Sequence, residues 1–432
     1  MSLEHSKHGD MLWDSTVSTD RRTGTSAGWY LPFVALFSAS QVFFRWFVAP
    51  RTTSETRVRT KAQVKAETVD VHSRETATPS VTTVRLSEID LCRGFLVALM
   101  TNTHALSLAG VPADSFWWSD GWLPNGWATQ CFIVLSGYAV GVLYTSDPTA
   151  RRGGRRLLQR AGQIFVVMFV SNIFFLLAQL TAHGALTDAW DIFWWIGLIT
   201  FATPYSISAI LLPTAVLLCL APRLLHFAST QLWLYFVVTA VGSLMTAVAS
   251  VYLLVSKTDS HLLGILLTTG IGGFPVLPFV LYGAVGIGLG RLLLVSPASH
   301  WCLCGCLALA QSALYLWSTE SSGLVLAMVT RTLTAPGKFA WVFLVAFWVC
   351  RSSFGGCVRW LELLGRFALG AFVLHRVFLH VFYGVVSGSP LLVSSQSRYV
   401  VLVSATLLAT WGVMMLRQRY EAIDRTLKRG YL

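Results

Sequence analysis

The chain has 432 residues, of which 54% are hydrophobic and only 12% are charged. Soluble globular proteins carry about twice that share of charged residues, so the composition excludes an ordinary soluble globule and predicts a multi-pass membrane protein. The net charge of +12 does not indicate a nucleic-acid partner, because the Lys and Arg residues lie at the ends of apolar runs, where membrane topology accounts for them.

The apolar stretches predict the fold class. About ten or eleven of them are long enough to cross a bilayer. They are continuous, whereas membrane β-barrel strands alternate apolar and polar residues in short segments. We therefore predict an all-α, polytopic fold with about 10–11 transmembrane helices and membrane lipids as its surroundings.

The N-terminal part precedes the main set of apolar stretches. Residues 1–28 are polar and lack the basic-then-apolar pattern of a cleaved signal peptide. Residues 29–48 predict a signal-anchor-like helix, although Arg45 leaves an interfacial helix as the alternative. Residues 49–87 are rich in Thr, Ser and Arg and predict a flexible cytosolic linker.

The remaining spans follow one another closely. Residues 190–221 contain Pro204 and Pro213 and form either one broken span or two short helices, and Pro336 is among the residues that interrupt the segment before 338. A single span at 190–221 makes residues 417–432 a basic cytosolic tail. The predicted spans are 88–108, 127–145, 161–181, 190–221, 231–255, 273–291, 300–318, 338–350, 363–386 and 398–416.

Eight cysteines are scattered through these spans, where they act as small packing residues. Cys302, Cys304 and Cys306 suggest a metal cluster at first sight. On a helix, however, positions two apart point in different directions, and we expect no partner histidine nearby. The sequence therefore predicts no metal site.

Two ionisable residues stand out in the first of these spans, 88–108. Arg93 and His104 are eleven residues apart, so on a helix they share one face and lie about 16 Å apart along the axis. An ionisable residue deep in a membrane span marks a functional site by default. Two simpler interpretations stay open: His104 bonds to a neighbouring helix, and Arg93 only ends the span at the membrane surface.

Other charged residues lie near the same membrane face. Asp90, one turn before Arg93, is expected to pair with it and orient its guanidinium. A basic loop follows span 127–145. It is explained either by membrane topology or by an anionic cofactor, and it contains Arg151, Arg152, Arg155, Arg156 and Arg160.

These residues resemble a known clan. Glu88-Ile-Asp90-Leu-Cys-Arg93-Gly94, with His104 ten positions later, is similar to the opening motif of integral-membrane acyltransferases, which include acyltransferase-3, OpgC-type and heparan-alpha-glucosaminide N-acetyltransferase proteins. Phe132 to Tyr138 and Leu364-Gly365-Arg366 to His375 resemble later motifs of the clan. The clan usually has a serine where this chain has Phe367. The resemblance implies a ten-helix acyltransferase-like domain at residues 88–416.

The resemblance implies an O- or N-acyltransferase that moves an acetyl- or succinyl-like group from cytosolic acyl-CoA to an acceptor, with a carbohydrate as the expected class. His104 would act as general base or carry the acyl group itself. Arg93, Arg155, Arg156 and Arg160 would bind the coenzyme phosphates, with Asp90 supporting Arg93. Residues expected to bind the substrate are Ser136, Tyr138 and His375.

The main alternative is a proton-coupled transporter or flippase that uses the buried ionisable residues without acyl transfer. Internal inverted repeats would favour it, and none is visible in the sequence. A non-catalytic membrane scaffold is a third possibility, which the shared face of Arg93 and His104 weakens.

Overall fold

A computed structural model describes ten parts of the chain, all within one compact unit that includes Ser87–Leu432. The predicted N-terminal segment, signal-anchor-like helix and linker up to residue 86 lie outside the described residues, as does the tail from residue 421. The described residues are 87–118, 126–144, 151–182, 210–256, 261–267, 275–318, 324–352, 356, 358–387 and 394–420.

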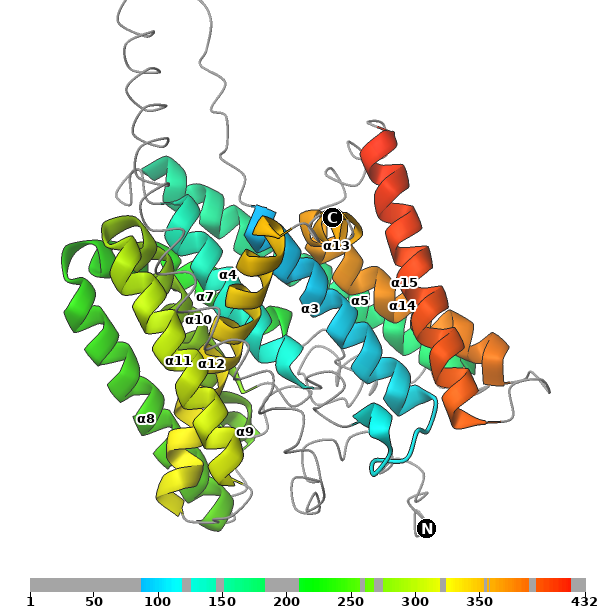
Figure 1. Ribbon diagram of the computed structural model, residues 1–432, viewed down its shortest axis with the longest axis horizontal. Coiled ribbons are helices and arrows are strands. Elements are labelled where there is room, and N and C mark those ends of the chain that lie inside the picture. Colours follow the sequence, from blue (N-terminus) through cyan, green and yellow to red (C-terminus); the bar gives the residue numbers. More distant parts are fainter. Residues whose placement is uncertain are drawn as a thin grey trace, which may run out of the picture. The chain divides into compact units, whose positions relative to one another are not determined.

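Within these ranges the secondary structure consists of α-helices and one short 3-10 helix, η3 (Phe116–Trp118), with no strand (Figure 1). The all-α prediction is confirmed. The helices are α3 (Ser87–Leu108), α4 (Trp127–Leu143), α5 (Arg151–Ala182), α7 (Leu211–Thr230), α8 (Leu232–Ser256), α9 (His261–Leu267), α10 (Val276–Val295), α11 (Pro297–Ser318), α12 (Leu324–Arg351), α13 (Arg359–Arg366), α14 (Ala368–Ser387) and α15 (Ser395–Arg419).

Six of the described helices are long and apolar enough to cross a membrane: α7, α8, α10, α12, α14 and α15. Helix α8 shows which surface meets lipid. Its exposed side chains recur at helical spacing and include Trp233 (69% exposed), Val237, Val241 and Met245 (63% exposed). Such an apolar exposed stripe suits hydrocarbon rather than water. The polytopic prediction is therefore confirmed, while the total of ten to eleven spans includes segments outside the described residues.

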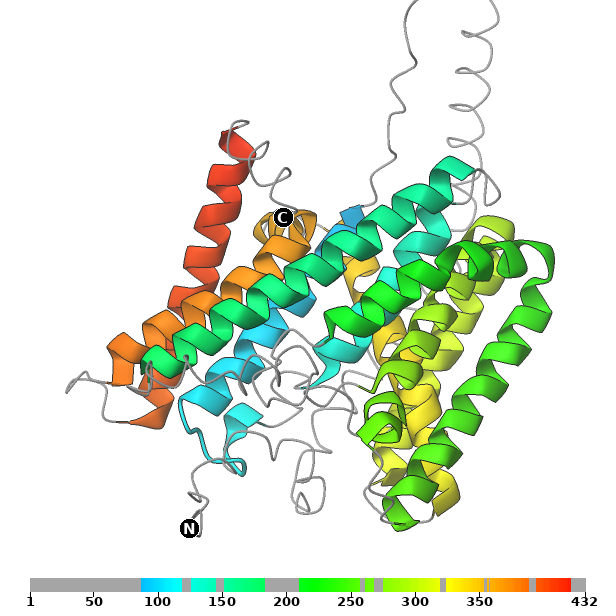
Figure 2. The same cartoon turned by 180° about the vertical axis from the view of Figure 1, so that it is seen from behind.

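Helix α3 lies among the other helices, packing against α4, α12, α13, α14 and α15 (Figures 1 and 2). It is 22 residues long, or about 33 Å, which is enough to cross a bilayer. The sequence suggested that α3 was apolar enough to cross a membrane, but α3 is not one of the six apolar helices named above. It contains the polar residues Asp90, Thr101 and Asn102, which are buried against protein rather than exposed.

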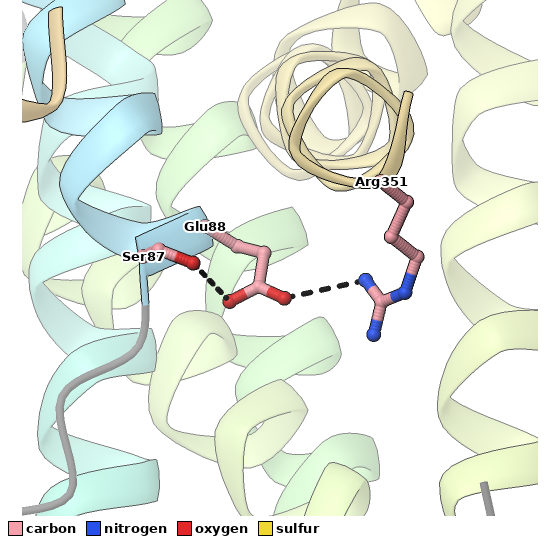
Figure 3. A network of polar contacts seen from close by, with 3 residues as sticks. All are labelled: Ser87, Glu88 and Arg351. Atoms are coloured by element: carbon pink, nitrogen blue, oxygen red, sulfur yellow. Dashed lines mark hydrogen bonds and ion pairs between the residues drawn. The ribbon is translucent and has the colours of Figure 1, made fainter. Parts of the chain in front are cut away.

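The two ends of α3 are fixed by different interactions. At the first turn, Arg351 of α12 donates to the Glu88 carboxylate at 3.2 Å, and Ser87 donates to the same carboxylate at 3.4 Å (Figure 3). At the other end, Gly110 adopts the left-handed φ of 66°, so that its amide and that of Val111 bond back to the last turn. The first interaction joins α3 to α12, and the second ends the helix at Leu108.

Glycines bring α4 and α10 into backbone contact. A Cβ atom on Gly137 would collide with the carbonyl of Gly283, and one on Gly141 would collide with the carbonyl of Ile287. Gly137 and Gly141 are four residues apart on α4, a spacing at which small residues let two helices approach closely.

Two predicted helix boundaries are wrong. The expected interruption before residue 338 is absent, because α12 continues through Pro336 over 28 residues. The polar Lys338 is accommodated in this helix by a hydrogen bond to Gln130 at 3.3 Å. The predicted span 363–386 is instead two helices, α13 and α14, which meet at Phe367. Of the segment 190–221, only the part from residue 210 is described.

The segment from Arg151 to Arg160 was predicted as a basic loop, and this is also wrong. It forms the first turns of α5, which continues as one helix to Ala182. Arginine is a good helix former, and the helix runs through Gly153 and Gly154 although each glycine weakens it by about 1 kcal/mol.

Candidate functional site

Two histidines from different helices face each other. The imidazole rings of His104 on α3 and His375 on α14 are stacked, with centroids 5.8 Å apart and planes inclined by 15°. His375 is fully buried, and its Nδ1 lies 3.2 Å from the carbonyl oxygen of Ala371. Its Nε2 has no hydrogen-bond partner among the described residues. A buried nitrogen left open in this way is available to a ligand.

Helix α14 also contains two further ionisable residues near the histidine pair. Arg376 and His380 both act electrostatically on His104. The two histidines and Arg376 together form a polar cluster between apolar helices, and a cation at such a position stabilises negative charge that develops beside it. Of these α14 residues, only His375 was expected from the sequence to bind the substrate.

The far end of α3 is held by residues that the sequence did not single out together. Tyr399 of α15 donates a hydrogen bond of 2.5 Å to the Asn102 carbonyl oxygen, and Trp117 packs on the Tyr399 ring at 5.2 Å. Asn102 therefore joins α3 to α15. A tyrosine in an apolar span needs a partner for its hydroxyl, and this was the signal available in the sequence.

The near end of α3 contains the predicted pair of Asp90 and Arg93, whose charged groups are 3.8 Å apart. The Arg93 side chain remains 28% exposed. A Cβ atom on Gly94 would collide with the carbonyl of Leu361, and one on Gly365 would collide with that of Asp90. The first and last of the sequence motifs are thus in direct backbone contact through α3 and α13.

The arginines of α5 that were predicted to bind phosphate lie at two positions along the helix. Arg155 and Arg156 are exposed on the first turns of α5. Arg160, further along α5, interacts electrostatically with Arg417 of α15. Arg417 is only 4% exposed and stacks its guanidinium on the Phe367 ring at 4.6 Å.

Sequence reasoning assigned Arg417 to membrane topology alone, so its burial and its contact with Phe367 were missed. Phe367, at the position where the clan usually has a serine, supplies the aromatic face for this guanidinium. In the sequence, Arg417 is a basic residue directly after an apolar span. Membrane topology explains such a residue as well as a role in a site does.

Ser136 and Tyr138 point away from each other, because two residues on a helix are separated by about 200°. Ser136 bonds to the carbonyl of Phe132 at 2.8 Å. Phe132 packs on Phe372 of α14 at 6.2 Å, and Phe372 stands against His375 at 5.7 Å. This face of α4 is therefore next to the histidine pair.

Tyr138 lies on the opposite face of α4, against α11 and α12. Its ring packs on Phe343 at 4.9 Å, Phe339 at 5.5 Å and His300 at 5.8 Å. The structure does not bring Tyr138 to His104, although the sequence grouped it with His375 and Ser136. The spacing of Ser136 and Tyr138 on α4 did not reveal which neighbouring helix each of the two side chains would contact.

The expectation that no histidine lies near the cysteine run is wrong. His300 Nε2 is 3.6 Å from Cys304 Sγ, one turn away on α11. Cys302 and Cys306 are exposed on other faces of the helix. Among the described residues, no group of three or more His, Cys, Asp or Glu side chains is arranged to hold a metal ion.

The comparison with protein families decides the assignment. A family model described as an acyltransferase domain, that of acyltransferase-3, matches residues 86–415. The chain belongs to the acyltransferase-3 family. The match begins at α3 and ends within α15, so this acyltransferase-3 region contains both His104 and His375. No curated protein and no solved structure matches the chain. The protein is a multi-pass membrane protein of an acyltransferase family.

Proposed function

We propose that the chain transfers an acyl group from cytosolic acyl-CoA to a carbohydrate acceptor at or across the membrane. The observation that carries the proposal is the stacked pair of His104 and His375 beside Arg376, within a domain of an acyltransferase family. Acyl transfer needs a base near a thioester carbonyl and a positive group for its oxyanion, and this cluster has both.

In the direct route, His104 takes the proton from the acceptor hydroxyl or amine as that group attacks the thioester carbon. Arg376 stabilises the oxyanion of the tetrahedral intermediate. The carbon–sulfur bond then breaks, and the His104 imidazolium returns the proton to the thiolate of coenzyme A. His375 positions His104 through the stacked rings.

The two-step route uses the same residues. The His104 nitrogen attacks the thioester carbon, the thiol leaves, and the acyl-imidazole is then attacked by the acceptor. In the second route the two histidines have different roles: His104 carries the acyl group, and His375 acts as base for the acceptor.

The donor's phosphates fit the arginine end of the domain. Arg160 and Arg417 carry like charges that act on each other, and a bound anion would relieve that repulsion. Arg93 and the exposed Arg155 and Arg156 add further positive charge. Several phosphate oxygens are the natural ligands of such a group. This supports acyl-CoA as the donor and the cytosol as the side on which these arginines lie.

The acceptor class rests on the resemblance of the motifs to acyltransferases of sugars. A proton-coupled transporter or flippase is the other function to be tested, because it would use the same buried ionisable residues. Membership of an acyltransferase family favours transfer over transport alone.

The test is transfer of label from radiolabelled acetyl-CoA to a panel of glycans by the purified protein in lipid nanodiscs. His104→Ala is expected to lower the rate by about 10²–10⁴-fold, and Arg93→Ala to weaken donor binding. His226→Ala, at an exposed histidine of α7, is the matched control and should transfer label as the unaltered chain does.

Equal transfer by the His104→Ala variant would remove His104 from the chemistry. Failure of the unaltered chain to bind acetyl-CoA would overturn acyl-CoA as the donor and favour the transport alternative.

A further inference from the structure

Two threonines of α15 leave their hydroxyls without a partner. Thr406 and Thr410 are both fully buried, and neither hydroxyl makes a hydrogen bond within the described part of the chain. Buried hydroxyls on other helices bond to a carbonyl three or four residues earlier. They belong to Thr101, Ser171, Thr214, Thr239, Thr246, Ser250 and Ser312.

This contrast is informative because the ordinary bond is available to any helical threonine and costs the chain little. A buried hydroxyl that makes no bond is unfavourable and calls for an explanation. Ser243 of α8 is also unpartnered, but it is a single residue on a helix whose opposite face is exposed. Thr406 and Thr410 are one turn apart on one face.

That face runs along the side of α15 that is buried. Thr406 lies eleven residues before Arg417, a distance of about 16 Å along the helix, and about 6 Å from Thr410. The buried residues of the face are, in order, Tyr399, Leu402, Thr406, Thr410, Met414 and Arg417.

Contacts at both ends place the two threonines of α15 at the level of His375 on α14. Leu402 belongs to the same hydrophobic cluster as Leu379 of α14. Arg417 lies against Gly370 of α14. On α14, His375 lies between Gly370 and Leu379, and on α15 the two threonines lie between Leu402 and Arg417. The hydroxyls and His375 therefore occupy the same stretch of the seam between α14 and α15.

The order of groups along this seam matches one kind of ligand. A buried guanidinium comes first, and two hydroxyls follow at the level of an imidazole whose Nε2 has no partner. The pantetheine arm of coenzyme A has phosphate at one end, two amides in the middle and the thioester at the other end. Its amides are separated by two methylene groups, which is comparable with one helical turn. A hydroxyl both donates and accepts, so it can bond to either side of an amide.

We propose that Thr406 and Thr410 bind the two amides of the pantetheine arm, and that the arm lies along α15 from Arg417 to the histidine pair. The inference rests on the proposed function, since it names how the same site holds its donor. Both hydroxyls are closed off in the described conformation, so the arm enters as the seam between α14 and α15 opens.

The experiment measures binding of two probes to the full-length protein in nanodiscs. Coenzyme A contains the arm, whereas adenosine 3′,5′-bisphosphate has the nucleotide phosphates without it. Thr406→Val and Thr410→Val keep the side-chain shape and remove the hydroxyl. Each variant should weaken coenzyme A binding by about three- to tenfold, and the double variant by the product of the two. Binding of the bisphosphate should not change.

Stability provides a second readout. Without ligand, the two valine variants should melt at the same temperature as the unaltered protein or higher, because valine removes an unsatisfied hydroxyl. Thr239→Val is the matched control: its buried hydroxyl bonds to Tyr235 at 2.8 Å. It should lower the melting temperature and leave coenzyme A binding unchanged.

The outcomes separate this inference from the function on which it rests. Unchanged coenzyme A binding by the double variant overturns the inference and leaves the donor assignment intact. An equal loss of both probes also overturns it, because the substitutions then act on the helix rather than on the arm. If the unaltered protein binds neither probe, the donor assignment itself fails and the inference fails with it.

Discussion

His375 and His300 are both fully buried histidines with an unpartnered ring nitrogen, yet their surroundings differ. His375 stacks on a second histidine and has Arg376 next to it in the chain, whereas His300 lies among Tyr138, Phe343 and other aromatic rings. Burial alone therefore does not distinguish a histidine of the proposed site from one that serves packing. The neighbouring charges make the distinction.

This comparison leads to a paired test. In the two-step route His375 acts as base, and His375→Phe keeps a flat ring against His104 but removes both nitrogens. The protein should then fold while its kcat falls at least about tenfold and its KM for acetyl-CoA changes little. His300→Phe should leave kcat unchanged. Initial-rate kinetics on both variants, with circular dichroism as a check of folding, would measure this. A full kcat for His375→Phe would reduce His375 to a packing role.

Gly137 shows how helix pairs rather than single side chains set the position of the site. Its backbone contact with Gly283 fixes the distance between α4 and α10, and the face of α4 that carries Phe132 then packs toward α14 and His375. In lipid, where hydrophobic burial does not drive helices together, such close packing supplies the attraction.

Gly137→Ala is accordingly expected to destabilise the protein by about 1–3 kcal/mol. The added Cβ would collide with the backbone carbonyl of Gly283, which cannot turn aside as a flexible side chain can. Gly162→Ala is the control: Gly162 is exposed on α5 and nothing lies near its Cβ position. That change should be neutral or stabilise by up to about 1 kcal/mol. Thermal unfolding in detergent compares the two, and equal melting temperatures would refute the close-packing argument.

For the molecule as a whole, the orientation in the membrane determines whether the donor reaches its site. The arginine-rich start of α5 and the segment after α3 are expected on opposite sides, with the arginines in the cytosol. Arg155→Cys should then react with a membrane-impermeant thiol reagent from the cytosolic face, and Asp114→Cys from the other face. Vesicles of known orientation provide the measurement, with the unaltered chain as background for its exposed cysteines. The reverse labelling pattern would place the arginines away from cytosolic acyl-CoA.

Much of this architecture was predictable from the sequence, because apolar length and helical spacing are properties of one segment at a time. The first helix, predicted at residues 88–108, is observed at Ser87–Leu108, and the pairing of Asp90 with Arg93 follows from their spacing on it. The motif residues were sufficient to suggest the acyltransferase family.

The sequence did not predict which faces meet. Four features depend on how whole helices rotate and tilt against one another: the stacking of His375 on His104, the opposite orientation of Tyr138, the bond from Tyr399 to Asn102 and the stacking of Arg417 on Phe367. These rotations are set by the joint packing of many side chains and by backbone contacts at glycines. The helices and their polar residues are therefore properties of the sequence, whereas the assembly of a site from them is a property of the tertiary structure.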